Sequence, residues 1–129
     1  MGKRILVIDD DAAFAEMLRV TLSAKGYEVE TCLQAPLAFR KILEWRPDLI
    51  TLDILMPGRS GWEIVNQLRA NPQASKSPII IITGVRGPLI VDEALLLPGM
   101  RYEKLYKPFE LEDLYRKVAH LIGKPADVQ

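Results

Sequence analysis

The sequence predicts an α/β protein with a doubly wound, five-stranded parallel sheet between two layers of helices. Two observations lead to this fold class. Short apolar runs alternate with segments of helical period along the whole chain, which is the order of a parallel sheet with right-handed crossovers. The most reactive polar residues directly follow the apolar runs, at the sheet edge where such folds form their sites. The 129 residues suit one domain.

The first third of the chain shows this alternation clearly. Residues 5–8 are a continuous apolar run, as expected of a strand buried on both faces. Residues 12–25 carry apolar side chains at helical spacing, with Asp11 placed as the N-cap and Gly26 as the stop signal. Residues 28–33 are predicted to form the second strand.

The middle of the chain continues the pattern. Residues 36–45 are predicted to form a helix that has Pro36 in its first turn and Pro47 just beyond its end. Residues 48–55 contain a further buried strand, and residues 61–71 have the apolar spacing of a helix.

The last third supplies two more strands and two helices. Residues 78–83 contain four consecutive isoleucines and are predicted to form a central strand. The remaining predicted elements are a short helix at 89–97, a fifth strand at 102–106 and an amphipathic helix at 111–122.

Composition excludes several broad classes of function. Seventeen basic residues balance seventeen acidic ones, so no net charge draws the chain to nucleic acid or to an anionic membrane. The apolar run near the N-terminus is too short for a signal peptide, and no stretch has the ~20 apolar residues that span a bilayer. We therefore expect a cytoplasmic domain over residues 1–123, with 124–129 as a tail or the start of a linker.

Five polar residues mark one candidate site. Asp9 and Asp10 follow the first predicted strand, Asp53 ends the third, Thr83 ends the fourth and Lys107 ends the fifth. Adjacent carboxylates repel one another, and a hard cation such as Mg²⁺ relieves that repulsion. A hydroxyl and an ammonium group nearby suit a phosphoryl group that carries negative charge.

Four short motifs around these residues resemble the response regulator receiver family. They cover essentially the whole chain in the family's order: Ile8-Asp9-Asp10, Asp53 with Met56-Pro57-Gly58 and Gly61, Thr83-Gly84, and Lys107-Pro108-Phe109. The resemblance implies a flavodoxin-like (βα)5 sandwich and a signalling domain that is not an enzyme in its own right.

The resemblance also implies a role for each site residue. Asp53 is expected to accept a phosphoryl group, while Asp10, Asp53 and the backbone carbonyl of Leu55 bind Mg²⁺, for which Mn²⁺ can substitute. Asp9 is expected nearby, directly or through water. Thr83 and Lys107 are expected to contact the phosphoryl oxygens. A cis peptide bond before Pro108 and space for the donor at Gly84 are expected as well.

The partners implied by the resemblance are a sensor histidine kinase or a phosphotransfer protein, and a downstream effector or output domain. A homodimer through the last two helices is a further expectation. The sequence contains no helix-turn-helix or catalytic output segment, so direct DNA binding by this chain is not expected.

Two of the departures from the family pattern bear directly on how the site works. Lys104 stands where receivers usually carry an aromatic switch residue, and Tyr102 and Tyr106 flank it with the same strand parity. Leu55 and Val85, each two residues after Asp53 or Thr83, are apolar and cannot orient a water molecule. The second departure predicts that the acyl phosphate is lost slowly.

Two other classes of function remain open from the residues alone. A receiver-like docking module that is never phosphorylated is one of them: the intact set of acids, threonine and lysine argues against it, while Lys104 keeps it open. An aspartyl-phosphate hydrolase of the haloacid dehalogenase type is the other, although such enzymes place two aspartates at i and i+2 after the first strand, whereas Asp9 and Asp10 are adjacent.

Overall fold

The computed structural model describes residues 2–56, 59–71, 76–84 and 101–125. Most of the described strands form one parallel five-stranded sheet, and two very short ones form an antiparallel hairpin. The sheet strands are β1 (Arg4–Ile8), β2 (Glu28–Cys32), β3 (Leu49–Asp53), β6 (Ile79–Thr83) and β7 (Tyr102–Tyr106); the hairpin strands are β4 (Leu55–Met56) and β5 (Arg59–Ser60).

The strand order across the sheet is β2-β1-β3-β6-β7, and all neighbours are parallel. The chain first moves from β1 to β2 on one side and then continues from β3 on the other. The direction therefore reverses beside β1, and the carboxyl ends of β1 and β3 border the crevice in which doubly wound sheets bind their ligands.

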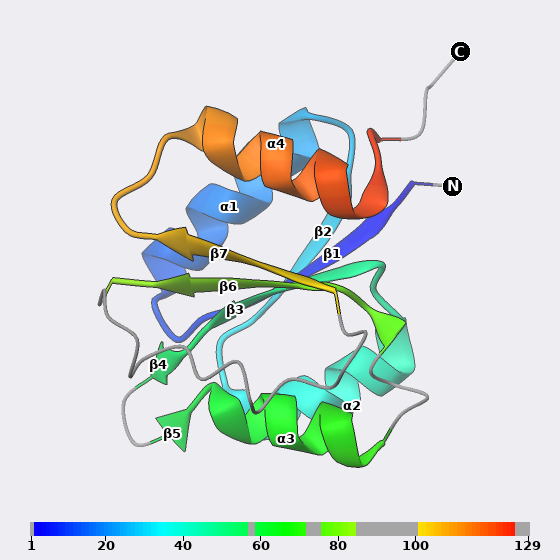
Figure 1. The fold of residues 1–129 in the computed structure, drawn as a ribbon, viewed down its shortest axis with the longest axis vertical. Helices are drawn as coiled ribbons and strands as arrows, with labels where there is room; N and C mark the ends of the chain where they lie inside the picture. Colours follow the sequence, from blue (N-terminus) through cyan, green and yellow to red (C-terminus); the bar gives the residue numbers. More distant parts are fainter. Residues whose placement is uncertain (1, 57–58, 72–75, 85–100, 126–129) are drawn as a thin grey trace.

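Helices cover both faces of the sheet (Figure 1). Of the helices in the described part of the chain, the first and last cover one face, and the remaining pair covers the other. The first pair is α1 (Ala12–Ala24) and α4 (Leu111–Ile122); the second is α2 (Ala35–Trp45) and α3 (Trp62–Ala70).

The sheet residues alternate between two apolar cores. Ile79 and Ile81 of β6 pack in the core beneath α2 and α3, whereas Ile80 and Ile82 pack in the core beneath α1 and α4. All four side chains are essentially inaccessible to solvent. A run of consecutive β-branched residues is therefore required here because both faces of this strand are covered.

Local signals determine where several elements begin and end. Asp11 caps α1, its side chain accepting a hydrogen bond from the Phe14 N–H at 3.1 Å. Gly26, with a φ of 106°, follows the end of α1 in a conformation that suits glycine. At the other end of the chain, side chains from Lys3, Tyr27 and Arg101 donate to the last carbonyl groups of α4 and of Gly123.

The predicted fold class and the order of the described elements are confirmed. The boundaries differ by only one or two residues, and the third strand ends at Asp53 as predicted, with Leu55 lying beyond it. Leu55 is part of the separate β4–β5 hairpin, because the chain bends at Ile54 after β3 ends. The predicted helix at 89–97 and residues 126–129 of the predicted tail lie outside the described residues. Within the described part of the chain, no helix is long and apolar enough to span a bilayer.

Candidate functional site

The predicted site residues converge at the carboxyl edge of the sheet. Asp9 directly follows β1 and Asp53 ends β3, while Lys107 directly follows β7. Thr83 ends β6 and is paired in register with Tyr106, the residue before Lys107. Because four neighbouring parallel strands end at the same level, residues nearly one hundred positions apart in sequence lie together.

Three carboxylates form the acidic part of the site. One oxygen from each of Asp9, Asp10 and Asp53 can be chosen so that the three atoms lie within 4.8 Å of one another. Asp9 and Asp53 are buried, at 2% and 8% exposure, whereas Asp10 is exposed. Asp11 is turned away into its capping contact, as predicted, and its backbone N–H donates to Asp9 Oδ1 at 2.9 Å.

Lys107 supplies positive charge beside this cluster. Its Nζ lies 3.6 Å from Asp9 Oδ2 and 3.7 Å from Asp53 Oδ2. The Lys107 backbone N–H donates to the Thr83 carbonyl at 2.8 Å, which continues the β6–β7 ladder past the end of β7. The Lys107–Pro108 peptide bond is cis, as predicted. The lysine and the buried Thr83 are thus held against the same edge as the acids.

Burial dominates the electrostatics of Asp9. Removal of its carboxylate from water raises its pKa, and the neighbouring Asp53 and Asp10 charges act in the same direction. The hydrogen bond from Asp11 and the charge of Lys107 oppose this shift but do not cancel it. The ionised cluster is therefore an unfavourable arrangement that a bound cation would stabilise.

The donor set fits Mg²⁺. Carboxylate oxygens are hard ligands, and an octahedral ion with bonds of about 2.1 Å holds opposite ligands about 4.2 Å apart. The oxygens at up to 4.8 Å need only small side-chain rotations to meet that spacing. The exposed carboxylate of Asp10 leaves one side open to water or phosphate, which magnesium sites commonly retain.

Two glycines border the site, one tightly packed and one open. A Cβ on Gly61 would lie 2.6 Å from the backbone oxygen of Asp53 and 2.9 Å from the Cα of Ile54. The Gly61 N–H also donates to the Ile54 carbonyl at 2.7 Å, so the start of α3 closes directly on the acceptor strand. Within the described part of the chain, a Cβ on Gly84 would meet nothing within 4 Å, which fits the space expected there for an incoming donor.

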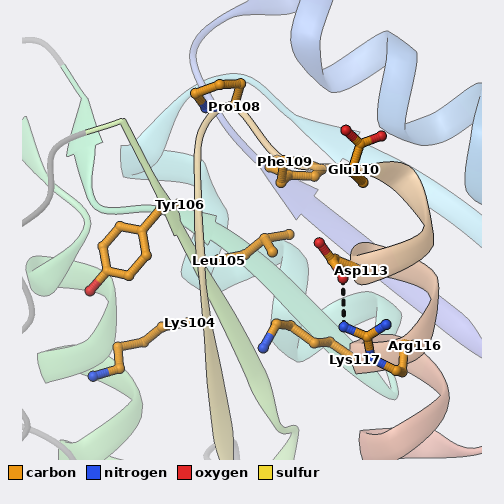
Figure 2. A pocket seen from close by; sticks show the side chains of 9 residues that line it. All are labelled: Lys104, Leu105, Tyr106, Pro108, Phe109, Glu110, Asp113, Arg116 and Lys117. Carbon is orange, nitrogen blue, oxygen red and sulfur yellow. Dashed lines mark hydrogen bonds and ion pairs between the residues drawn. The ribbon is translucent and has the colours of Figure 1, made fainter.

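One departure from the expected pattern, Lys104, falls on β7. Lys104 and Tyr106 leave β7 on the side opposite Leu105, Asp113 and Lys117 (Figure 2). Tyr102 has the same parity and packs against the core beneath α2 and α3. Val85 and the side chain of Leu55 lie outside what the structure describes.

Phe14 was missed as a site residue by the sequence reasoning, which treated it as one of several apolar positions on α1. Its ring lies beside the ammonium group of Lys107, 3.9 Å from Nζ to the ring centroid. The sequence signal available was an aromatic residue three positions after the Asp11 cap, and this signal does not identify a lysine 93 positions away.

Comparisons with known proteins agree with this geometry. The profile of the response regulator receiver domain matches residues 5–119. The chain is 36% identical over 118 residues to the DNA-binding response regulator MtrA of Mycolicibacterium paratuberculosis, covering 92% of this chain and 50% of that protein. It is 34% identical over 127 residues to the phosphate regulon transcriptional regulatory protein PhoB of Rhizobium meliloti, covering 96% and 54%. The chain thus spans about half the length of the curated relatives it matches.

Solved structures give the same result. The chemotaxis protein CheY4 of Vibrio cholerae has a TM-score of 0.81 and 31% identity, covering 92% of this chain and 98% of that one. The response regulator TrrA of Thermotoga maritima, solved in complex with Mg²⁺ and BeF, has a TM-score of 0.77 and 32% identity with the same coverage.

Substitution of the two glycines is expected to have opposite outcomes. Gly61→Ala forces a methyl group into the Asp53 backbone and should lower the free energy of unfolding by roughly 1–3 kcal/mol, while displacing the acceptor strand end. Gly84→Ala serves as the matched control and should leave stability unchanged. Urea denaturation of both variants checks this, and equal stability of the two would contradict it.

Asp9→Asn should stabilise the metal-free protein at neutral pH. Because the pKa of Asp9 is raised by burial, its ionised form costs folding free energy at pH values above its folded pKa. The advantage of Asn should shrink as the pH falls through that pKa, and should vanish below the unfolded pKa of about 3.9. Urea denaturation in EDTA across pH measures it, with Asp11→Asn as a control that keeps the cap. A variant less stable than the native protein at neutral pH would be the contrary result.

Proposed function

The chain belongs to the response regulator receiver family, and on that premise we propose that it accepts a phosphoryl group on Asp53 in a Mg²⁺-dependent reaction. The observation that carries the proposal is the meeting of Asp53 with Asp9, Asp10 and Lys107 at one sheet edge, close enough for one cation and one phosphoryl group. The domain acts in signalling rather than as a catalyst of external substrates.

The chemistry proposed is an in-line transfer from a phosphohistidine. A carboxylate oxygen of Asp53 attacks phosphorus, the P–N bond of the donor breaks, and the imidazole nitrogen leaves with the electron pair. Bound Mg²⁺, held by Asp10, Asp53 and the Leu55 carbonyl with Asp9 direct or through water, would neutralise charge on the acids and the phosphoryl oxygens. Mn²⁺ would substitute.

Two residues of the chain would hold the transferred group. Lys107 already lies between Asp9 and Asp53, so its ammonium needs little movement to contact a phosphoryl oxygen. Thr83 is buried at the end of the adjacent strand and would donate its hydroxyl to another oxygen. The open space at Gly84 would admit the donor side chain.

The family implies a histidine kinase as partner, and we propose that the kinase or a phosphotransfer protein is the direct donor. MtrA is described as DNA-binding and is about twice as long as this chain. A downstream effector or output domain is therefore proposed here as well, with residues 1–123 as the receiver unit and 124–129 as the tail or the start of a linker. Dimerisation through the last two helices, the predicted one at 89–97 and α4, is proposed as a mode of output.

The competing functions receive less support. A phosphorylation-independent docking module would not require Asp9 and Asp53 to be buried side by side, where burial and the charge of Asp53 raise the pKa of Asp9. A hydrolase would require a group that orients water, and the apolar residues Leu55 and Val85 occupy the two positions from which that group would be expected.

Acetyl phosphate in the presence of Mg²⁺ should add one phosphoryl group to the native protein, as measured by intact mass. Asp53→Asn should abolish the gain because the nucleophile is lost. Asp11→Asn, a neighbouring acid whose replacement still caps α1, should be labelled like the native chain. No gain in the native protein, or an equal gain in Asp53→Asn, would defeat the proposal.

The phosphorylated form should persist for minutes or longer in Mg²⁺ buffer without a phosphatase. The reason is that Leu55 and Val85 offer no polar group to direct water at the acyl phosphate. The decay of the phosphorylated mass after removal of acetyl phosphate measures the lifetime, and loss within seconds would refute the expectation.

A further inference from the structure

The ammonium group of Lys107 has an aromatic neighbour besides the two carboxylates. Its Nζ lies 3.9 Å from the centroid of the Phe14 ring, well within cation–π range. The Phe109 ring meets Phe14 edge to face, with centroids 6.1 Å apart and planes at 87°. Phe14 comes from α1 and Phe109 follows the lysine in sequence, so the ring that faces the lysine is itself supported by a second part of the chain.

The position of the Phe14 ring is fixed from three directions. Its backbone N–H is held by the Asp11 cap, its side chain packs against the core beneath α1 and α4, and Phe109 supports it at the edge. Asp11 is in turn bonded through its backbone to Asp9. The loop that supplies the acids therefore also places the ring, and a shift of one would move the other.

From this geometry we propose that Phe14 is a positioning residue for phosphoryl transfer, one that keeps the Lys107 ammonium beside the acceptor when a divalent cation occupies the carboxylates. The inference rests on the proposed phosphoacceptor function. It assigns to the ring the task of holding a flexible side chain whose electrostatic partners become neutralised during the reaction.

Distances explain why such a residue is needed. The separations of 3.6 and 3.7 Å from Nζ to the carboxylate oxygens exceed hydrogen-bond length, so charge attraction rather than directed bonding holds the lysine there. A bound cation removes much of that attraction and repels the ammonium group. The attraction of the ring depends on its quadrupole, which the cation does not neutralise, and it lies on the side supplied by α1.

The matching experiment separates rate from metal binding. Phe14→Leu keeps an apolar side chain but removes the aromatic face, so phosphorylation by acetyl phosphate at saturating Mg²⁺ should slow roughly 3- to 30-fold. The Kd for Mg²⁺, measured by calorimetry, should not rise, because Phe14 contacts the lysine and not the acids. Phe14→Tyr retains the ring and should restore the native rate.

A control of the same kind is available away from the site. Tyr115 packs against the same core and its ring lies 4.5 Å from Lys25 Nζ, just beyond the end of α1 opposite the site. Tyr115→Leu should lower stability without slowing phosphorylation. If it slows the reaction as much as Phe14→Leu does, the effect of Phe14 is general destabilisation and the proposal fails.

A spectroscopic signature tests the contact directly. NMR of lysine-labelled protein should show the ε-methylene protons of Lys107 shifted upfield by the ring current at saturating Mg²⁺, and Phe14→Leu should abolish that shift. Absence of the shift in the native protein with Mg²⁺, or a native rate in Phe14→Leu, overturns the inference alone. Failure of the native protein to take up a phosphoryl group overturns both this inference and the proposed function.

Discussion

The structure depends on how a parallel sheet concentrates like charges at one edge. Asp9 and Asp53 lie at the ends of adjacent strands and are almost inaccessible to solvent, and Lys107 places an opposite charge beside them. Two neighbouring buried carboxylates are unfavourable by themselves, and the extensive apolar cores on both sheet faces must offset that cost. The same unfavourable charge gives the site its affinity for a cation and, through the cation, for a phosphoryl group.

Hydrogen bonds from the backbone hold the site residues in place. The Lys107 N–H is bonded to the Thr83 carbonyl, and the Gly61 N–H is bonded to the carbonyl of Ile54, next to the acceptor. The Asp11 N–H is bonded to the Asp9 carboxylate. These bonds fix the backbone at or next to the residues that bear the chemistry, so little conformational freedom remains to be lost when a ligand binds.

Sequence patterns predicted most of this because each signal is local. The four isoleucines of β6 indicate a strand covered on both faces, and an aspartate before an apolar period indicates a helix cap; both are confirmed. The spacing of Gly61 against Asp53 and of Phe14 against Lys107 was not predicted, because these are contacts between separate elements. The β4–β5 hairpin was missed for a related reason, since two-residue strands carry no periodicity.

Geometry also narrows how a signal can cross from the site to β7. Tyr102, Lys104 and Tyr106 share one side of this strand, but their surroundings differ. Tyr102 packs against the core beneath α2 and α3, so its movement would disturb that packing. Lys104 has no aromatic ring that could fill the space left when Thr83 moves. Tyr106 is the ladder partner of Thr83 and immediately precedes Lys107. A displacement of Thr83 toward a phosphoryl group would therefore reach Tyr106 first. Of the two tyrosines on this side of β7, Tyr106 is the better placed to act as the aromatic switch residue that is usual at the position of Lys104.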